Sequence, residues 1–336
     1  MGKGQNKGIF GGLLGEPTRE KGAGLAFSLA AILSPVASFL FMAALAAFGV
    51  SYNAQDDWYL YCAYLIPQLC FFAAAIFFFK WTKTPFKAEW GRQVRVHPLF
   101  YLLAVVLQTG LLSLSALNGW FLDLLGGLGF EDSGILLPSL DGFGFVGVLI
   151  AVALLPAVFE ELLFRGVVLK GLSTFGKAGA ILLCGALFSL YHQNPAQTLY
   201  QFVCGAAFAW VALNAKSILP TVVAHFLNNA FILFAEKFGF YAKIERGLLL
   251  ASIACLIVSV AFLTAYEILS ARKKKTLDNS VDKEAVALKT SDTGCDETVL
   301  SKPERKKARG LFWICAAVGV GICLLSWILA FVTGLN

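Results

Sequence analysis

Nine apolar segments separated by polar connectors run through the chain, and they constrain its fold more than any other feature. A helix needs about 20 apolar residues to cross the roughly 30 Å hydrocarbon layer of a bilayer. The segments are close to that length and cover residues 24–50, 60–79, 99–117, 143–169, 178–192, 199–214, 217–235, 247–270 and 311–332. We expect the first to be a retained span, because the core of a secretory signal has only about 7 to 15 residues.

The composition excludes a soluble domain with a polar surface. Hydrophobic residues make up 58% of the chain and charged residues 14%, and the mean hydropathy is +0.73. A transmembrane β-barrel would alternate in polarity over strands of about 10 residues, and these segments do not alternate. We therefore predict an all-α, polytopic transmembrane helical bundle with about eight core spans and one appended C-terminal span.

Lysine and arginine are concentrated in alternate connectors, which predicts the orientation in the membrane. The N-terminal arm and the connector 80–98 are basic, whereas the connectors 51–59 and 118–142 carry acidic residues and no basic ones. Basic residues return near positions 170–177, 216 and 272–275. We expect an integral multi-pass protein of a bacterial plasma membrane, with a cytoplasmic N-terminus and the C-terminus outside.

Charge and hydropathy divide the chain into four parts. Residues 1–23 form a basic cytoplasmic arm, and residues 24–270 form an eight-span core whose motifs lie within 143–235. Residues 271–310 are polar, of mixed charge and without apolar periodicity, which is typical of a disordered linker. Residues 311–336 form the appended transmembrane helix.

The cysteines and the net charge limit the partners. None of the eight cysteines belongs to a C-x-x-C pair, so their spacing indicates neither a disulfide framework nor a zinc site. The net charge of +6 is modest, and the basic stretches are not interleaved with aromatic residues, as nucleic-acid binding would require. Membrane lipids are expected partners, and nucleic acid is not.

Three charged residues interrupt the fourth apolar segment: Glu160, Glu161 and Arg165. Each would cost about 2.5 to 3.5 kcal/mol at a lipid-exposed helix centre, and such residues mark functional sites. Glu161 and Arg165 are four residues apart and share a helix face, so they can neutralise each other. Glu160 points elsewhere and is left as a free carboxylate. The alternative is a single buried ionic cluster that only ties helices together.

Two of the three histidines lie in apolar segments. His192 follows Phe188 by one helical turn, which supports the imidazole, and His225 shares a face with Asn229. Each histidine alone could simply hydrogen-bond between helices. Together, a free glutamate, two histidines and an asparagine are the groups that water activation and oxyanion stabilisation need.

The order Glu160-Glu161-x-x-x-Arg165, Phe188-x-x-x-His192 and His225-x-x-x-Asn229 resembles the CAAX protease and bacteriocin-processing family of intramembrane endopeptidases, which is related to the type II CAAX prenyl endopeptidases. The resemblance implies that Glu160 is the general base for a water that His192 helps to hold. It implies that His225 and Asn229 donate to the oxyanion, with Glu161, Arg165 and Phe188 in support. The substrate would be a CAAX-type prenylated protein or a bacteriocin-like peptide.

A zinc mechanism is an alternative, because Glu160, His192 and His225 resemble a His₂Glu catalytic set. No H-E-x-x-H is present, and asparagine is a better oxyanion donor than zinc ligand, so the favoured interpretation needs no cofactor. No G-x-S-x-G motif surrounds a serine, and no pair of aspartates lies in the apolar segments. Serine and aspartyl intramembrane proteases are therefore disfavoured.

A non-catalytic protein is the alternative from another class. A transporter, or an immunity or scaffold component, could use the Glu and His cluster as a proton relay or ligand site. Transporters often repeat their halves with broken helices in corresponding positions, and the chain has no second copy of the cluster.

Overall fold

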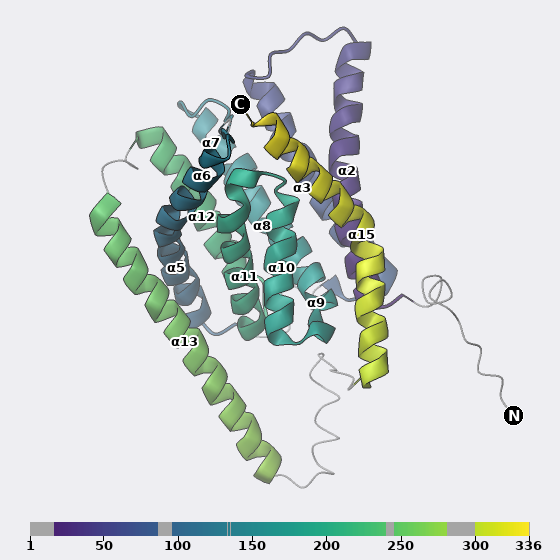
Figure 1. Ribbon diagram of the computed structural model, residues 1–336, viewed down its shortest axis with the longest axis vertical. Coiled ribbons are helices and arrows are strands. Elements are labelled where there is room, and N and C mark those ends of the chain that lie inside the picture. The colour runs from purple at the N-terminus through teal and green to yellow at the C-terminus, as the bar shows by residue number, and fades with distance from the viewer. Residues whose placement is uncertain are drawn as a thin grey trace, which may run out of the picture.

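The computed structural model describes residues 17–86, 96–132, 134, 136–239, 245–280 and 300–335. These residues are organised almost entirely as helices, and their β-structure is confined to an isolated bridge between Phe130 and Leu335 (Figure 1). The predicted all-α helical bundle is confirmed.

The helices follow one another along the chain as α2 (Arg19–Ala47), α3 (Asp57–Thr82), α5 (Leu99–Leu111), η1 (Leu112–Leu114), α6 (Ser115–Gly127), α7 (Gly144–Val148), η2 (Leu149–Leu154), α8 (Leu155–Leu163), η3 (Phe164–Val168), α9 (Leu169–Gly171), η4 (Ser173–Phe175), α10 (Lys177–Tyr191), η5 (Pro195–Gln197), α11 (Thr198–Ala215), α12 (Leu219–Phe238), α13 (Glu245–Ser280) and α15 (Lys302–Thr333).

Each of the nine predicted apolar segments coincides with a helix. Within the described residues, eight helical segments are long and apolar enough to cross a membrane, and α10 is a shorter apolar helix. The third segment ends within a further helix, α6, which begins at Ser115 and extends into the connector to Gly127. Length and apolarity therefore located the helices. The helix bounds differ from the predicted segments by several residues.

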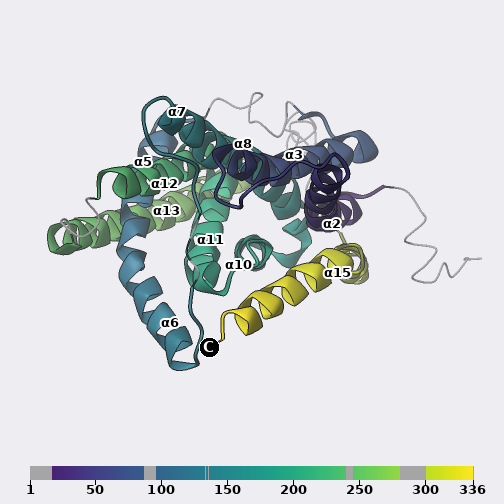
Figure 2. The same ribbon diagram turned by 90° about the horizontal axis from the view of Figure 1, so that it is seen from above.

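The central helices α10 and α11 lie between two outer groups. Figures 1 and 2 show α2, α3 and α15 on one side of them, and α5, α12 and α13 on the other. Two glycines allow α10 and α11 to approach closely, since a Cβ atom on Gly205 would lie 2.9 Å from the Cα atom of Gly185. The close approach brings the backbone of α11 within hydrogen-bonding distance of Arg165 on the fourth span.

The C-terminal helix α15 packs along α2, although nearly 300 residues separate them in sequence. Ser28 on α2 donates to the Cys315 carbonyl oxygen at 2.7 Å, and its hydroxyl accepts from the Gly319 amide at 3.0 Å. A Cβ atom on Gly319 would lie 2.6 Å from the Cα atom of Ser28. Small residues thus permit backbone contact between these helices, as is common inside membranes.

Basic residues at one end of the bundle join neighbouring helices. Lys177 pairs with Glu267 of α13 at 2.6 Å, and Arg309 donates to the Thr174 carbonyl oxygen at 2.9 Å. Both residues lie in stretches predicted to be cytoplasmic, whereas Figure 1 shows the C-terminus at the opposite end. The basic residues of 1–16 and 87–95 lie outside the described residues, and the orientation in the membrane stays a prediction.

The predicted linker is helical at both of its ends. Helix α13 continues to Ser280 and α15 begins at Lys302, where Ser301 and Glu304 form a capping box. Residues 281–299 lie outside the described residues. The division of the chain into four parts remains a prediction.

Candidate active site

The charged segment lies where the fourth span departs from regular α-helix. Helix α8 is flanked by two π-helical stretches, η2 before it and η3 after it. Glu160 and Glu161 occupy the last turn of α8, and Arg165 follows in η3. Insertions of π-helix are rare and often occur at functional sites. The two carboxylates therefore lie between two irregular stretches of helix.

Glu161 and Arg165 form the ion pair that their spacing predicts. Arg165 Nη1 donates to Glu161 Oε1 at 2.6 Å, and both side chains are fully buried. The second guanidinium nitrogen, Nη2, donates to the Gly205 carbonyl oxygen of α11 at 3.1 Å. The guanidinium also lies over the Phe188 ring, 4.4 Å from its centroid. This arginine therefore neutralises one carboxylate and fixes the fourth span against α10 and α11.

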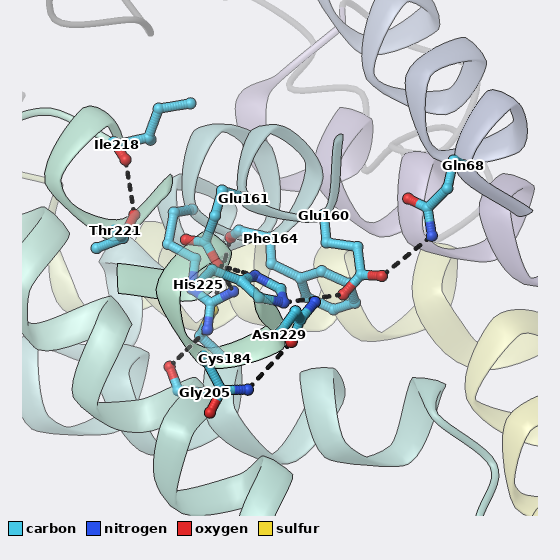
Figure 3. Close-up of polar contacts among 12 residues, drawn as sticks. Gln68, Glu160, Glu161, Phe164, Cys184, Gly205, Ile218, Thr221, His225 and Asn229 are labelled. Atoms are coloured by element: carbon cyan, nitrogen blue, oxygen red, sulfur yellow. Dashed lines mark hydrogen bonds and ion pairs between the residues drawn. The ribbon is translucent and has the colours of Figure 1, made fainter. Parts of the chain in front are cut away.

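His225, on α12, lies between the two carboxylates (Figure 3). Its Nδ1 is 3.0 Å from Glu161 Oε1, and its Nε2 is 3.9 Å from Glu160 Oε2. Because an ionised carboxylate only accepts hydrogen bonds, the contact with Glu161 places a proton on Nδ1. Nε2 is then an acceptor in the neutral ring and a donor in the imidazolium.

Glu160 differs from the prediction because its carboxylate has a partner. Gln68 Nε2, on α3, donates to Glu160 Oε1 at 3.2 Å. Gln68 was absent from the predicted site, and the only sequence signal for it is a single amide side chain inside the apolar segment 60–79. Glu160 is therefore held by a neutral donor, while the arginine is committed to Glu161.

His192 caps α10 and contacts Phe188 in two ways. Its Nδ1 is 2.8 Å from the Phe188 carbonyl oxygen, and the two rings meet edge to face with centroids 4.8 Å apart. The carbonyl accepts, so the proton lies on Nδ1 and Nε2 is left as an acceptor. The Phe188 ring also lies 6.0 Å from the His225 ring. The predicted support by Phe188 is present, and it extends to both histidines.

The Phe188 ring contacts the imidazoles of both His192 and His225, which places the two histidines on either side of one aromatic side chain. Within the described part of the chain, no direct hydrogen bond joins the His192 side chain to Glu160, His225 or Asn229. The contact between them would therefore run through a small molecule such as water, as the predicted mechanism requires.

Asn229 lies one turn after His225 on α12 (Figure 3). Its Nδ2 donates to the Val152 carbonyl oxygen in η2 at 3.2 Å, and its Oδ1 accepts from Asn228 Nδ2 at 3.1 Å. The amide group of Asn229 is thereby fixed beside the His225 imidazole.

The zinc alternative would draw on Glu160, His192 and His225 as ligands. Among the described residues, no group of three or more His, Cys, Asp or Glu side chains is arranged to hold a metal ion. His225 Nδ1 and His192 Nδ1 are each committed to a protein oxygen. A His₂Glu set would need the remaining Nε2 atoms and Glu160 to converge on one point.

Residues 142–231 match the family model described as "Type II CAAX prenyl endopeptidase Rce1-like". The chain contains an Rce1-like segment. The segment is somewhat more than a quarter of the chain, and it includes every predicted site residue but not Gln68. No curated protein and no solved structure shows a significant match to the chain.

The Rce1-like match supports CAAX-type intramembrane protease activity at the level of the family. A protease of this family acts on a peptide or protein substrate in a membrane. Together with the eight apolar helices, the match also supports an integral multi-pass membrane protein. The resemblance inferred from three short motifs thus agrees with the family model.

Proposed function

We propose that this protein is an intramembrane endopeptidase in which Glu160 activates water to hydrolyse a peptide bond of a CAAX-type or other membrane-delivered peptide substrate. The observation that carries the proposal is the different environment of two adjacent carboxylates. Glu161 is fully buried, and its Oε1 contacts both Arg165 Nη1 and His225 Nδ1. Glu160 has a neutral amide donor on one oxygen and faces His225 Nε2 with the other.

Glu160 would act as general base and then as general acid. A water donates one O–H to Glu160 and the other to His192 Nε2. Glu160 takes the first proton as the water oxygen bonds to the carbonyl carbon, and the C=O π electrons move to the carbonyl oxygen. The protonated Glu160 then gives its proton to the leaving nitrogen, an oxyanion lone pair re-forms the C=O bond, and the C–N bond breaks. Peptide and water become an acid and an amine, and the Glu160 carboxylate is restored.

His225 and Asn229 would stabilise the oxyanion. The Nδ1 proton of His225 is held by Glu161, so Nε2 donates to the oxyanion when the ring is an imidazolium. Asn229 supplies a neutral N–H donor. Removing one such donor typically costs about 10²- to 10³-fold in kcat.

Glu160→Gln tests the general base. The amide has the size of the carboxylate but cannot take a proton, and we expect cleavage to fall by roughly 10²- to 10⁴-fold. The measurement is mass spectrometry of the products from a prenylated peptide with a C-terminal tetrapeptide, using protein purified in detergent. Glu236→Gln, at an exposed carboxylate on the same helix as His225, is the matched control and should retain activity.

Full activity of Glu160→Gln would contradict the proposed base. Cleavage by the wild-type protein should continue after exhaustive chelation; loss that Zn²⁺ restores would favour the His₂Glu alternative. Proton flux in liposomes without peptide cleavage would instead favour a transporter.

A further inference from the structure

Asn228 is a buried polar residue that the proposed mechanism does not use. It precedes Asn229 on α12, and only 6% of its surface is exposed. We propose that Asn228 is a positioning residue that determines which end of the Asn229 carboxamide faces the reaction. The proposal rests on the oxyanion role of Asn229 in the proposed function.

Two side chains from two other helices donate to the oxygen end of the Asn228 side chain. Gln108 Nε2, on α5, donates to Asn228 Oδ1 at 2.7 Å. The Tyr200 hydroxyl, on α11, donates to the same oxygen at 2.7 Å. A carboxamide oxygen has two lone pairs, and its NH₂ group has none to offer. These two contacts therefore favour one of the two amide orientations of Asn228, with its Nδ2 directed away from Gln108 and Tyr200.

The Asn228 side chain in turn hydrogen-bonds to the Asn229 side chain. Asn228 Nδ2 donates to Asn229 Oδ1 at 3.1 Å, so the oxygen of Asn229 faces Asn228 and its NH₂ group faces the other way. One N–H of that group donates to the Val152 carbonyl oxygen at 3.2 Å. The second N–H is then the donor that an oxyanion requires.

The two ends of a carboxamide are nearly identical in shape, so packing alone does not choose between them. An Asn229 side chain turned by half a revolution would present an oxygen to the oxyanion and repel it. In a buried site the choice is made by hydrogen bonds, which are strong where water is excluded. The Val152 carbonyl oxygen, which can only accept, and Asn228, which Gln108 and Tyr200 contact, together favour the donor orientation of Asn229.

Asn228→Asp tests this series of hydrogen bonds with a side chain of almost the same size. Its carboxylate still accepts from Gln108 and Tyr200, but an oxygen replaces the NH₂ group that faces Asn229. We expect kcat to fall about 10- to 100-fold with KM changed less than about twofold, because an oxyanion contact acts mainly in the transition state. Tyr200→Phe removes one donor and keeps the ring, and we expect a smaller loss of about 3- to 10-fold.

A double-mutant cycle distinguishes a positioning residue from one that only holds helices together. A residue of the second kind would change kcat by the same factor with and without the Asn229 side chain. In an Asn229→Ala background, Asn228→Asp and Tyr200→Phe should each change kcat by less than about twofold, because the group they orient is gone. Their thermal unfolding temperatures are compared with that of Asn229→Ala, so that a folding defect is recognised. Tyr200→Phe keeps the experiment informative where the aspartate variant does not fold.

The outcomes separate the two proposals. A large loss in Asn229→Ala, with wild-type kcat in both Asn228→Asp and Tyr200→Phe, would overturn the positioning role alone. Losses of equal size with and without the Asn229 side chain would also overturn it. Wild-type activity in Asn229→Ala would overturn the oxyanion role, and the positioning role with it.

Discussion

The Glu160 carboxylate receives a hydrogen bond from a helix outside the Rce1-like segment. Gln68 is buried on α3 and donates to Glu160 Oε1. A hydrogen bond to a charged group contributes about 1.5 to 3 kcal/mol, which is enough to hold one rotamer of a glutamate. Gln68 is therefore placed to orient the proposed base.

Gln68→Met should lower kcat about tenfold or more while KM changes less than about twofold, since a contribution of 1.4 kcal/mol corresponds to a factor of ten. Methionine fills a similar volume in the apolar surroundings and donates no hydrogen bond. The measurement is steady-state cleavage of the prenylated peptide. Gln55→Met, at an exposed position in the loop before α3, is the control. An unchanged kcat would show that Glu160 is oriented without Gln68.

Some partners at this scale were predictable and others were not. The pairing of Glu161 with Arg165 follows from their spacing within one helix. Gln68 and Asn228 have partners on other helices, and sequence spacing carries no information on those contacts. A neutral amide in an apolar segment is equally compatible with helix association and with a site. The charged residues could be recognised from the sequence because a charge inside the membrane has a high free-energy cost and therefore marks a functional site.

Among the helices, the fourth span shows that an apolar pattern does not predict local changes of helical period. It was expected as one helix over 143–169, and the structure contains π-helical turns on both sides of α8. An amphipathic helix reveals its period through alternating polar and apolar faces. Most of this span is apolar on every side, so a local change of period leaves no mark in the sequence.

The contact between α10 and α11 depends on the absence of a side chain at Gly205. A Cβ atom there would lie 2.9 Å from Gly185 Cα and 3.0 Å from the Phe188 ring. Its carbonyl oxygen also accepts from Arg165. Any separation of the two helices therefore disturbs both the buried ion pair and the aromatic ring beneath the histidines.

Gly205→Ala should lower the free energy of unfolding by about 1 to 3 kcal/mol, the usual cost of overpacking, and should reduce cleavage as well. The measurement is thermal unfolding of the purified protein together with peptide cleavage. Gly321→Ala on α15 is the matched control, because nothing lies within 4 Å of the added Cβ atom. Equal stability of the two variants would contradict the close contact.

For the whole molecule, the positions of the apolar helices were predictable and their arrangement was not. Each span could be located because it must be long and apolar enough to cross the bilayer. Which helices become neighbours depends on small residues and buried polar pairs at interfaces, such as Ser28 with Cys315. The C-terminal helix was expected as an appendage, and its contacts with α2 carry no signature that charge or hydropathy could reveal.

Helix α15 lies outside the Rce1-like segment, but it contacts the turn that carries His192. Gln193 follows His192 with a left-handed backbone, φ 53°, which is costly for a residue other than glycine. Its side chain donates to Cys323 Sγ of α15 at 3.7 Å. Further along, Trp327 Nε1 donates to Thr198 Oγ1 at 2.8 Å. The turn between α10 and α11 is thus held by the last helix of the chain.

Trp327→Phe removes the indole N–H and keeps an aromatic ring that can still stack on Phe331. If α15 fixes the turn, kcat should fall about 3- to 10-fold, the equivalent of one hydrogen bond of about 1 kcal/mol. The unfolding temperature should stay near that of the wild type, because the packing of α15 on α2 is untouched. Trp313→Phe, on the same helix but against Phe175, is the control and should retain its turnover. Equal turnover in the two variants would mean that α15 supports the bundle without influencing His192.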